Sequence, residues 1–426
     1  MALVVVTGAS VLTACTADPS PSAVSVAWAG AAKHSVRVTW KDDNAPNRIT
    51  IEGVLSEGPS YVQYLPAGQG NSWDIPTSAF PPDGNYRVVV TNGTSKDGLT
   101  GSPAKSPVFD TDGPVRPNSA LALKHRSGVL VRWTVPAARQ DFTPNDPLDV
   151  TGKRVLKYVP MIGRPGAQPV AIGPATTTPS QVIKDIKPPF LFQVRTENEW
   201  SSNLGAQAIG LTSTATVWAP PLAQFGLSIR VQGRVVLQKT QCAPEADCAL
   251  EQTTAAGIPL TVLSQLTPNA RWTPVAVGKT SAGGHYDIPV VTPSSRPYKV
   301  VASSYATPGV LTSAAVSPEV FTRAVVRLAR GGFLPGNNVK TGHPVTISAT
   351  VSPSYSSVAT LELWNRHTRQ WAYVTRVPLK RGQVLYAFKA GAVGEYSYRF
   401  VFPRTASAGR NMSGLTTPQF NLRIRP

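Results

Sequence analysis

The sequence is poor in charged residues and in long apolar runs, and each shortage excludes a class of protein. Charged residues make up only 15% of the 426 residues, whereas 40 prolines and 34 glycines interrupt the chain. This composition disfavours long surface helices and favours short strands joined by turns. After the first dozen residues no apolar run reaches the roughly 18 residues that a membrane-spanning helix needs, which excludes a polytopic membrane protein.

Residues that commonly carry catalysis or bind metal are scarce as well. The five histidines are His34, His125, His285, His343 and His367. None has a second His, Cys or carboxylate at ligand spacing, which argues against a metal site. The motif Gly-x-Ser-x-Gly is absent, and Gly278-Lys279-Thr280 lacks the first glycine of a phosphate-binding loop, because Thr273 stands there. We therefore expect no catalytic residues, no metal and no cofactor, and we expect that the protein is not an enzyme.

Only three cysteines occur, and their spacing suggests two different roles. Cys242 and Cys248 are six positions apart, which predicts a small loop closed by a disulfide between them. Cys15 then has a separate role. A disulfide of this kind favours an exported protein.

The N-terminal segment ends at Cys15 with a pattern of its own. An apolar run from Ala2 to Leu12 leads into Leu12-Thr13-Ala14-Cys15, and a Pro/Ser-rich segment follows. This resembles the lipobox of bacterial lipoproteins, which implies that residues 1–21 are a signal and tether and that Cys15 carries lipid at the cell surface. The opening Met1-Ala2-Leu3 lacks the basic residues of a signal peptide. The alternative is a first β-strand from Ala2 to Val6 and a free thiol at Cys15.

From Ala23 onward apolar residues alternate with polar ones at a period of two, which is typical of half-buried strands. Val36, Val38 and Trp40 share one strand face, and Val129, Val131 and Trp133 share another. We predict an all-β fold, a tandem array of four β-sandwich domains of Ig-like or fibronectin type III kind. The expected domains span residues 22–113, 114–213, 214–323 and 324–426.

Two motifs recur in the first two predicted domains. One is a strand that ends in a tryptophan, Ser35-Val-Arg-Val-Thr-Trp40 and Gly128-Val-Leu-Val-Arg-Trp133. The other is a late strand of the form aromatic-x-Val-x-x-x-Asn, which begins at Tyr86 and at Phe192. Both domains resemble fibronectin type III domains on these motifs. The spacing between the motifs is longer in the second domain, which we attribute to an insertion between Pro136 and Gly152.

The second half of the chain has landmarks of a different kind. Trp272 and Tyr298 are 26 residues apart, and Trp371 and Tyr396 are 25 apart, which predicts two copies of one sandwich type. These segments resemble the Ig-like domains of exported actinobacterial proteins, so the whole chain resembles an actinobacterial surface lipoprotein. We interpret Trp272 and Trp371, like Trp40 and Trp133, as core residues. We expect Trp200 and Trp364 to be exposed.

Positive charge is concentrated in the last predicted domain. Residues 324–426 contain fourteen Lys and Arg against two Asp and Glu, a formal net charge of +12 out of +18 for the chain. Such a domain attracts anionic partners. We expect an anionic cell-wall or extracellular polymer, or another surface protein, to bind near Arg366, Arg369, Lys380 and Arg381. A solubilising surface without a partner is the alternative, and no specific nucleic-acid contact is expected.

These observations favour a non-catalytic binding or spacer protein that is lipid-anchored at the bacterial surface. Two rival functions remain open. The chain could be a structural subunit of an extracellular or phage assembly, which defined oligomers would indicate. It could also be a carbohydrate-binding accessory protein, which a glycan screen would reveal.

The lipobox predicts that native Cys15 is acylated and is the first residue of the mature chain. Mass spectrometry of the native protein measures this directly, and Cys15→Ser should release the protein into the medium. A chain that still begins at Met1 with an unmodified Cys15 would contradict the lipoprotein interpretation.

The cysteine spacing predicts that Cys242 and Cys248 are oxidised to each other. Reduction should lower the stability of their domain by about 2 kcal/mol, because the loop that the disulfide closes is short. Alkylation of the native protein under non-reducing conditions checks this, and two reactive thiols would refute it.

Overall fold

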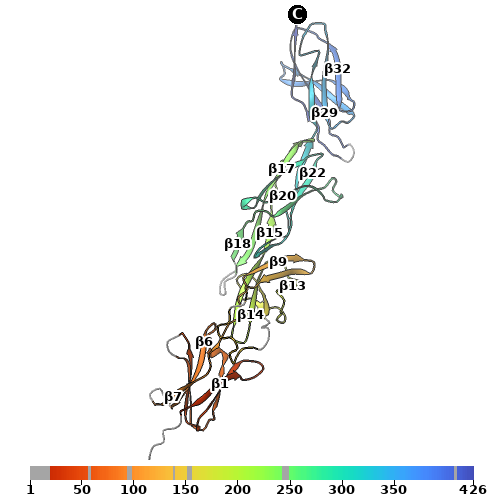
Figure 1. The fold of residues 1–426 in the computed structure, drawn as a ribbon. Helices are drawn as coiled ribbons and strands as arrows, with labels where there is room; N and C mark the ends of the chain where they lie inside the picture. The colour runs from red at the N-terminus through yellow and green to blue at the C-terminus, as the bar shows by residue number, and fades with distance from the viewer. Residues whose placement is uncertain are drawn as a thin grey trace, which may run out of the picture. The chain divides into compact units, whose positions relative to one another are not determined.

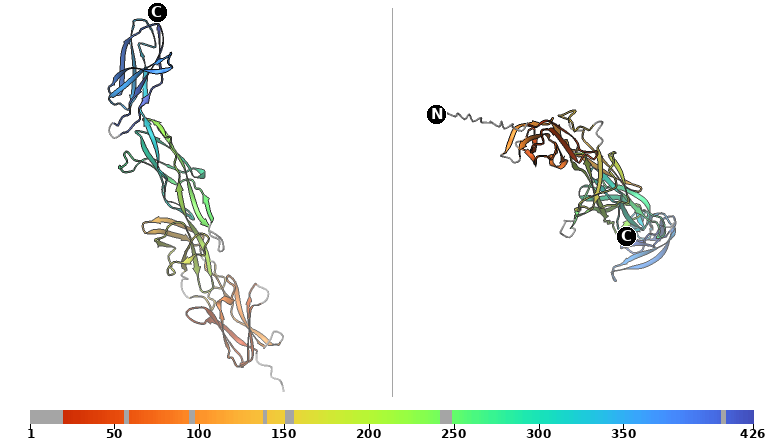
Figure 2. Two further views of the ribbon diagram at one scale, coloured as in Figure 1. Left: turned by 180° about the vertical axis from the view of Figure 1, so that it is seen from behind. Right: turned by 90° about the horizontal axis from the view of Figure 1, so that it is seen from below.

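The computed structural model describes residues 20–55, 59–93, 98–137, 140–150, 156–241, 249–406 and 410–426. The predicted all-β fold is confirmed, since these residues form strands, with 3-10 turns at Thr77–Ala79 and Ala282–Gly284. The coloured ribbon consists of arrows and loops in every view (Figures 1 and 2). The described part contains no helix long and apolar enough to cross a membrane. Cys15, Cys242 and Cys248 lie outside the described residues, so their modification and pairing stay predictions.

The chain forms two compact units. The first reaches Ala208, and the second runs from Ile209 to Pro426 and includes Arg164–Ala167 and Ile186–Phe190. Each unit is built from sandwiches of two mainly antiparallel sheets, which we call the first and second sandwich in the first unit and the third and fourth in the second.

The first sandwich packs a three-stranded sheet against a larger one. The order β1-β2-β5 comprises Ser22–Trp28, Ser35–Lys41 and Ser72–Pro76. The order β4-β3-β6-β7 comprises Pro59–Leu65, Asn47–Gly53, Asn85–Gly93 and Leu99–Lys105, with β8 (Phe109–Asp110) on β6. Val36, Val38 and Trp40 all point into the core, as the alternation predicts.

The second sandwich has the same division into two sheets. The order β13-β10-β9 comprises Ser180–Lys184, Gly128–Thr134 and Ser119–His125. The order β12-β11-β14-β15 comprises Val170–Ala171, Lys157–Gly163, Phe190–Glu197 and Ser202–Ala215, of which β15 passes into the second unit. Val129, Val131 and Trp133 are buried, and Trp133 contacts Phe192 at 6.1 Å between ring centroids.

Trp200 joins the first two sandwiches within the first unit, contrary to the expectation that it is exposed. It follows β14 of the second sandwich, yet it is 7% exposed and belongs to the core of the first. Its ring centroid lies 5.0 Å from that of Trp28 and 6.2 Å from that of Phe109, with which it is stacked. Sequence reasoning missed this because the apolar surroundings of Trp200 come from distant strands.

The predicted insertion after Pro136 completes this joint. Its Leu148 is buried in the same core cluster, and its carbonyl accepts a hydrogen bond of 2.9 Å from the Trp28 indole. Two segments of the second sandwich, one around Leu148 and one around Trp200, thus cover apolar surface of the first. Burial of this kind contributes the largest favourable term to folding.

The third and fourth sandwiches share one strand order. In the third, β16-β26-β22-β19-β20 comprises Leu222–Gln224, Val320–Val325, Arg296–Ala302, Pro259–Ser264 and Thr273–Lys279, with β25 (Ala315–Val316) on β22. In the fourth, β28-β35-β33-β30-β31 comprises Asn338–Lys340, Phe420–Arg425, Gly394–Phe402, Ser357–Asn365 and Gln370–Leu379, with β34 (Leu415–Thr416) on β33. In both sheets an early strand pairs in parallel with the last strand, β16 with β26 and β28 with β35. Two copies of one sandwich type are therefore present.

The opposing sheets differ in size, and that of the fourth sandwich has three strands. In the third sandwich β17 (Ser228–Gln241) pairs with β15, with β18 (Ala249–Thr253) and with β21 (His285–Val291). The short strands β23 (Tyr305–Thr307) and β24 (Val310–Thr312) pair with each other, and β24 also pairs with β15. In the fourth, β27-β29-β32 comprises Arg327–Leu334, Pro344–Ser352 and Gln383–Lys389. Figure 1 shows β29 and β32 near the C-terminus.

The joint predicts that Trp200→Ala destabilises the first sandwich, although Trp200 belongs to the second. The loss should be about 3 to 5 kcal/mol, the usual cost of removing a buried aromatic side chain. Amide hydrogen exchange in β2 and β6 during denaturant titration reports on the first sandwich. Trp218→Ala, which removes a half-exposed tryptophan elsewhere, is the control. If exchange in β2 and β6 is the same in the Trp200 variant, the joint does not stabilise that sandwich.

Candidate functional site

The outer face of the five-stranded sheet in the fourth sandwich carries aromatic and basic side chains together. Along β30, Leu361 points inward and is fully buried, whereas Glu362 and Trp364 point outward. The register places Trp364 opposite Trp371 of β31 and Glu362 between Tyr373 of β31 and Arg399 of β33. We call the outward side chains Trp364, Trp371, Tyr373, Arg376, Arg399 and Arg423 the aromatic–basic face.

Three contacts fix the centre of this face. The Arg399 guanidinium lies 4.3 Å from the centroid of the Trp371 ring, a cation–π contact. Its Nε donates a hydrogen bond of 2.6 Å to Oε2 of Glu362, which holds the guanidinium over the ring. Trp364 meets Trp371 edge to face, at 5.3 Å between centroids. The face is therefore braced by side chains that are themselves on the surface.

The third sandwich repeats this stack, and both copies correct the interpretation of Trp272 and Trp371 as core residues. The Lys299 ammonium lies 3.8 Å from the centroid of the Trp272 ring, and the Arg399 guanidinium lies 4.3 Å from that of Trp371. Both tryptophans are half-buried on outer faces. A buried tyrosine directly precedes the cation in each copy. It is Tyr298 in the third sandwich and Tyr398 in the fourth. Tyr396, the predicted landmark, is only half-buried.

The four basic residues predicted to bind a partner do not form a single patch. Arg366 and Arg369 lie in the turn between β30 and β31, and Lys380 and Arg381 lie in the turn after β31. All four are exposed. Since β31 has 10 residues, the two pairs are separated by about 30 Å along the strand. The side chains between them on the outer face belong to Trp371, Tyr373 and Arg376.

The two carboxylates of this domain are both engaged by arginine. Glu362 binds Arg399, and Oε2 of Glu395 lies 3.6 Å from Nη2 of Arg366, with both side chains exposed. Twelve further Lys and Arg residues lie in 324–426, and the domain has no other carboxylate side chain to pair with them. Of the aromatic–basic face, Tyr373 is 65% exposed, and Arg376 and Arg423 are also exposed. The arrangement can engage anionic groups through arginine and apolar sugar faces through aromatic rings.

An exposed tryptophan was missed by sequence reasoning. Trp218, between β15 and β16, is 53% exposed, whereas Trp364, which was expected to be exposed, is half-buried. The missed signal is the position of Trp218 in a Pro-containing connection, Trp218-Ala-Pro-Pro221, outside the alternating strands. Trp218 lines a hollow on the surface of the third sandwich.

One group of carboxylates approaches metal-ligand spacing in the described part of the chain. Oxygen atoms of Asp110, Asp146 and Asp149 lie within 4.8 Å of one another. Burial raises the pKa of the Asp146 carboxyl. Its oxygens accept hydrogen bonds from the backbone N–H groups of Asp110 (2.9 Å) and Leu148 (2.7 Å). We assign this group a structural role, because these bonds tie the insertion to the first sandwich.

Comparison with known proteins identifies no family. No family model matches the chain, and no curated protein matches its sequence. A crystal structure of a tetra-tandem repeat in the extending region of a large adhesion protein matches with 11% identity and a TM-score of 0.27, over 95% of this chain and 99% of that chain. The chicken CNTN1 FN1–FN3 domains match with 14% identity and a TM-score of 0.21, over 72% of this chain and 100% of that one. At these values neither likeness bears on function, which has to be argued from the side chains.

Proposed function

We propose that the protein is a non-catalytic, exported surface protein that binds an anionic polymer through the aromatic–basic face of its fourth sandwich. The observation that carries the proposal is the excess of cations in this domain, whose two carboxylates are both engaged by arginine. The other sandwiches act as a spacer between this domain and the N-terminal segment. Sandwich surfaces supply binding contacts without catalytic groups.

Arginine and aromatic side chains make this face suited to a polymer of acidic repeating units. Arginine binds carboxylate or phosphate with two parallel hydrogen bonds, and its charge persists at every physiological pH. The exposed Tyr373 ring offers an apolar surface next to Arg376 on the same strand. Repeated weak contacts along a polymer add up through effective concentration, so no deep pocket is required.

We further propose that the spacer is attached to the bacterial membrane by lipid at Cys15. The support for this is the apolar run that ends in Leu12-Thr13-Ala14-Cys15 and the Pro/Ser-rich segment after it. Each buried methylene contributes about 0.8 kcal/mol, so several acyl chains give stable anchoring. The polymer-binding domain would then be carried at the other end of the chain, outside the membrane.

Titration of the full chain with polygalacturonate and with polyphosphate tests the proposed function. We expect binding that weakens strongly between 0.1 and 1 M salt, because the Debye length falls from about 10 Å to about 3 Å. Tyr373→Ala combined with Arg376→Gln and Arg423→Gln should weaken binding at least about tenfold, or about 1.4 kcal/mol. These side chains are exposed, so the fold should persist. The pairs Arg366→Gln/Arg369→Gln and Lys380→Gln/Arg381→Gln, tested separately, show whether either turn extends the face.

A matched control removes cations from another sandwich. Lys124, Arg126, Lys184 and Lys187 of the second sandwich are exposed, and their replacement by Gln should leave the affinity unchanged within about twofold. Equal losses in the control and the face variants would mean that net charge alone attracts the polymer. No binding, or binding that is insensitive to both salt and the face variants, would favour the solubilising alternative.

A further inference from the structure

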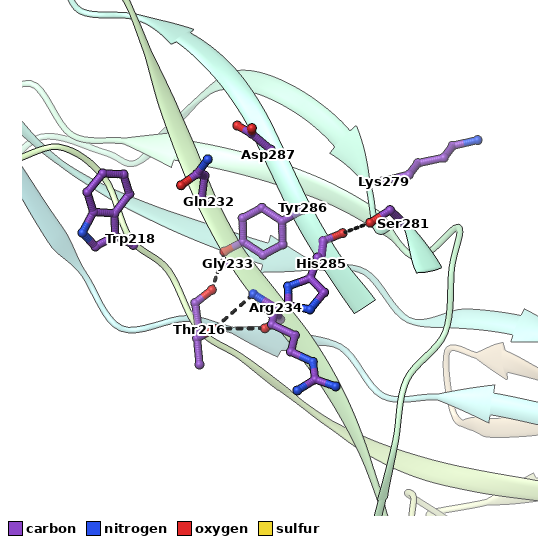
Figure 3. Close-up of a pocket in the computed structure, with 10 residues that line it drawn as sticks. All are labelled: Thr216, Trp218, Gln232, Gly233, Arg234, Lys279, Ser281, His285, Tyr286 and Asp287. Atoms are coloured by element: carbon purple, nitrogen blue, oxygen red, sulfur yellow. Dashed lines mark hydrogen bonds between the residues drawn. The ribbon is translucent and has the colours of Figure 1, made fainter. Parts of the chain in front are cut away.

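A second surface feature lies on the third sandwich, over the outer side of β17 and β21. It is a shallow hollow of about 720 Å³, within the size range of small-molecule sites. Figure 3 shows its lining, with Trp218 at one end and Lys279 at the other. Trp218, which is 53% exposed, also lines a neighbouring hollow of about 480 Å³. We call the larger one the Trp218 hollow.

The backbone holds Trp218 in a fixed place beside β17. Its N–H donates to the Gln232 carbonyl at 2.7 Å, and the Gln232 N–H donates back at 2.9 Å. The buried Tyr286 hydroxyl donates to the carbonyl of Thr216, two residues before Trp218. A Cβ at Gly233 would collide with both of these oxygens, so glycine is required there. An exposed tryptophan thus sits on a rigid element, which favours binding because little ordering is needed.

Polar side chains continue the row that begins at Trp218. Because paired residues of antiparallel strands share a face, Trp218, Gln232 and Asp287 lie side by side across three segments. Asp287 is paired with Arg230, Oδ1 to Nε at 2.9 Å, which neutralises its charge. The Trp218 ring is thus flanked by the Gln232 amide and by the Asp287–Arg230 ion pair. This arrangement suits a sugar, whose C–H face packs on the ring while its hydroxyls form hydrogen bonds with the amide, carboxylate and guanidinium groups.

Two cations line the hollow at different places, Arg234 near Thr216 and Lys279 at the end away from Trp218 (Figure 3). No ion pair with a carboxylate of the described residues engages either. The Arg234 Nε donates to the carbonyl of Gly283 at 2.9 Å, which directs the guanidinium along the surface. The one carboxylate of the lining, that of Asp287, is already neutralised by Arg230. The charge of the hollow is therefore complementary to an acidic ligand.

We propose that the Trp218 hollow binds a short stretch of acidic glycan, with one sugar stacked on Trp218 and the carboxylates of the hexuronate units toward Arg234 and toward Lys279. This site is separate from the aromatic–basic face and does not rest on the function proposed for it. Stacking on Trp218 supplies affinity, and the two cations supply the preference for an acidic over a neutral sugar.

Calorimetric titration of the full chain with trisaccharides tests the site. The probes are trisaccharides of galacturonate, glucuronate and mannuronate, each compared with its uncharged hexose counterpart. At least one uronate should bind, and at least about tenfold more tightly than its neutral counterpart, because two cations line the hollow. Trp218→Ala should weaken that binding at least about tenfold, while Trp218→Phe should keep part of it, because a smaller ring still stacks. Arg234→Gln with Lys279→Gln should remove the preference for the acidic sugar.

Two controls distinguish binding in the Trp218 hollow from binding elsewhere on the chain. Phe321→Ala removes a ring that is 59% exposed on the opposite sheet of the same sandwich, and it should not alter binding. The chain with Tyr373→Ala, Arg376→Gln and Arg423→Gln should bind the trisaccharides as the wild type does, which separates the hollow from the aromatic–basic face. The proposal is overturned if no uronate binds, if neutral and acidic sugars bind equally, or if Trp218→Ala leaves the affinity unchanged.

Discussion

Inward burial along every strand is the constraint on which the other features of this protein depend. Successive side chains of a strand point to opposite faces, so one face can fill the core only if the other faces solvent or another surface. Leu361 and Glu362 illustrate the rule at adjacent positions of β30. Large outward aromatics such as Trp371 and Tyr373 contribute little to the core, and their presence therefore points to a role in binding or in bracing of the sheet.

The same constraint decides what could be predicted. Alternation around Trp40 and Trp133 is regular, and both residues are buried as expected. Trp272 lies just before β20 and Trp371 near the start of β31, where alternation gives little information, so their repeated position in the two halves was wrongly taken to place them in the core. The prediction for Trp200 was wrong in the opposite sense, since this residue was expected to be exposed and is buried. The side chains that bury it are Trp28, Phe80 and Phe109, which are far away in the sequence. Local patterns do not report contacts of that kind.

For the candidate site, the composition predicts the net charge of the domain, whereas the strand order determines where the charged side chains lie. Charge counting identifies residues 324–426 as strongly basic without any knowledge of the fold. It does not place the charges, and Arg366 and Lys380 prove to lie in turns at opposite ends of β31. The face between them is assembled from β30, β31, β33 and β35, which requires the strand order. The repeated cation–π contact, Lys299 over Trp272 and Arg399 over Trp371, likewise could not be predicted from the sequence, because it depends on which strands are neighbours.

The parallel pairing of β16 with β26 and of β28 with β35 has a mechanical consequence. In each case a strand near the start of the sandwich lies beside its last strand and runs in the same direction. Tension applied through the two ends of such a sandwich pulls these strands along their length in opposite directions. Their hydrogen bonds are then loaded in shear and break together, rather than one after another as in an unzipping hairpin. Extension of the third or fourth sandwich through its two ends is thus opposed by hydrogen bonds that must break together.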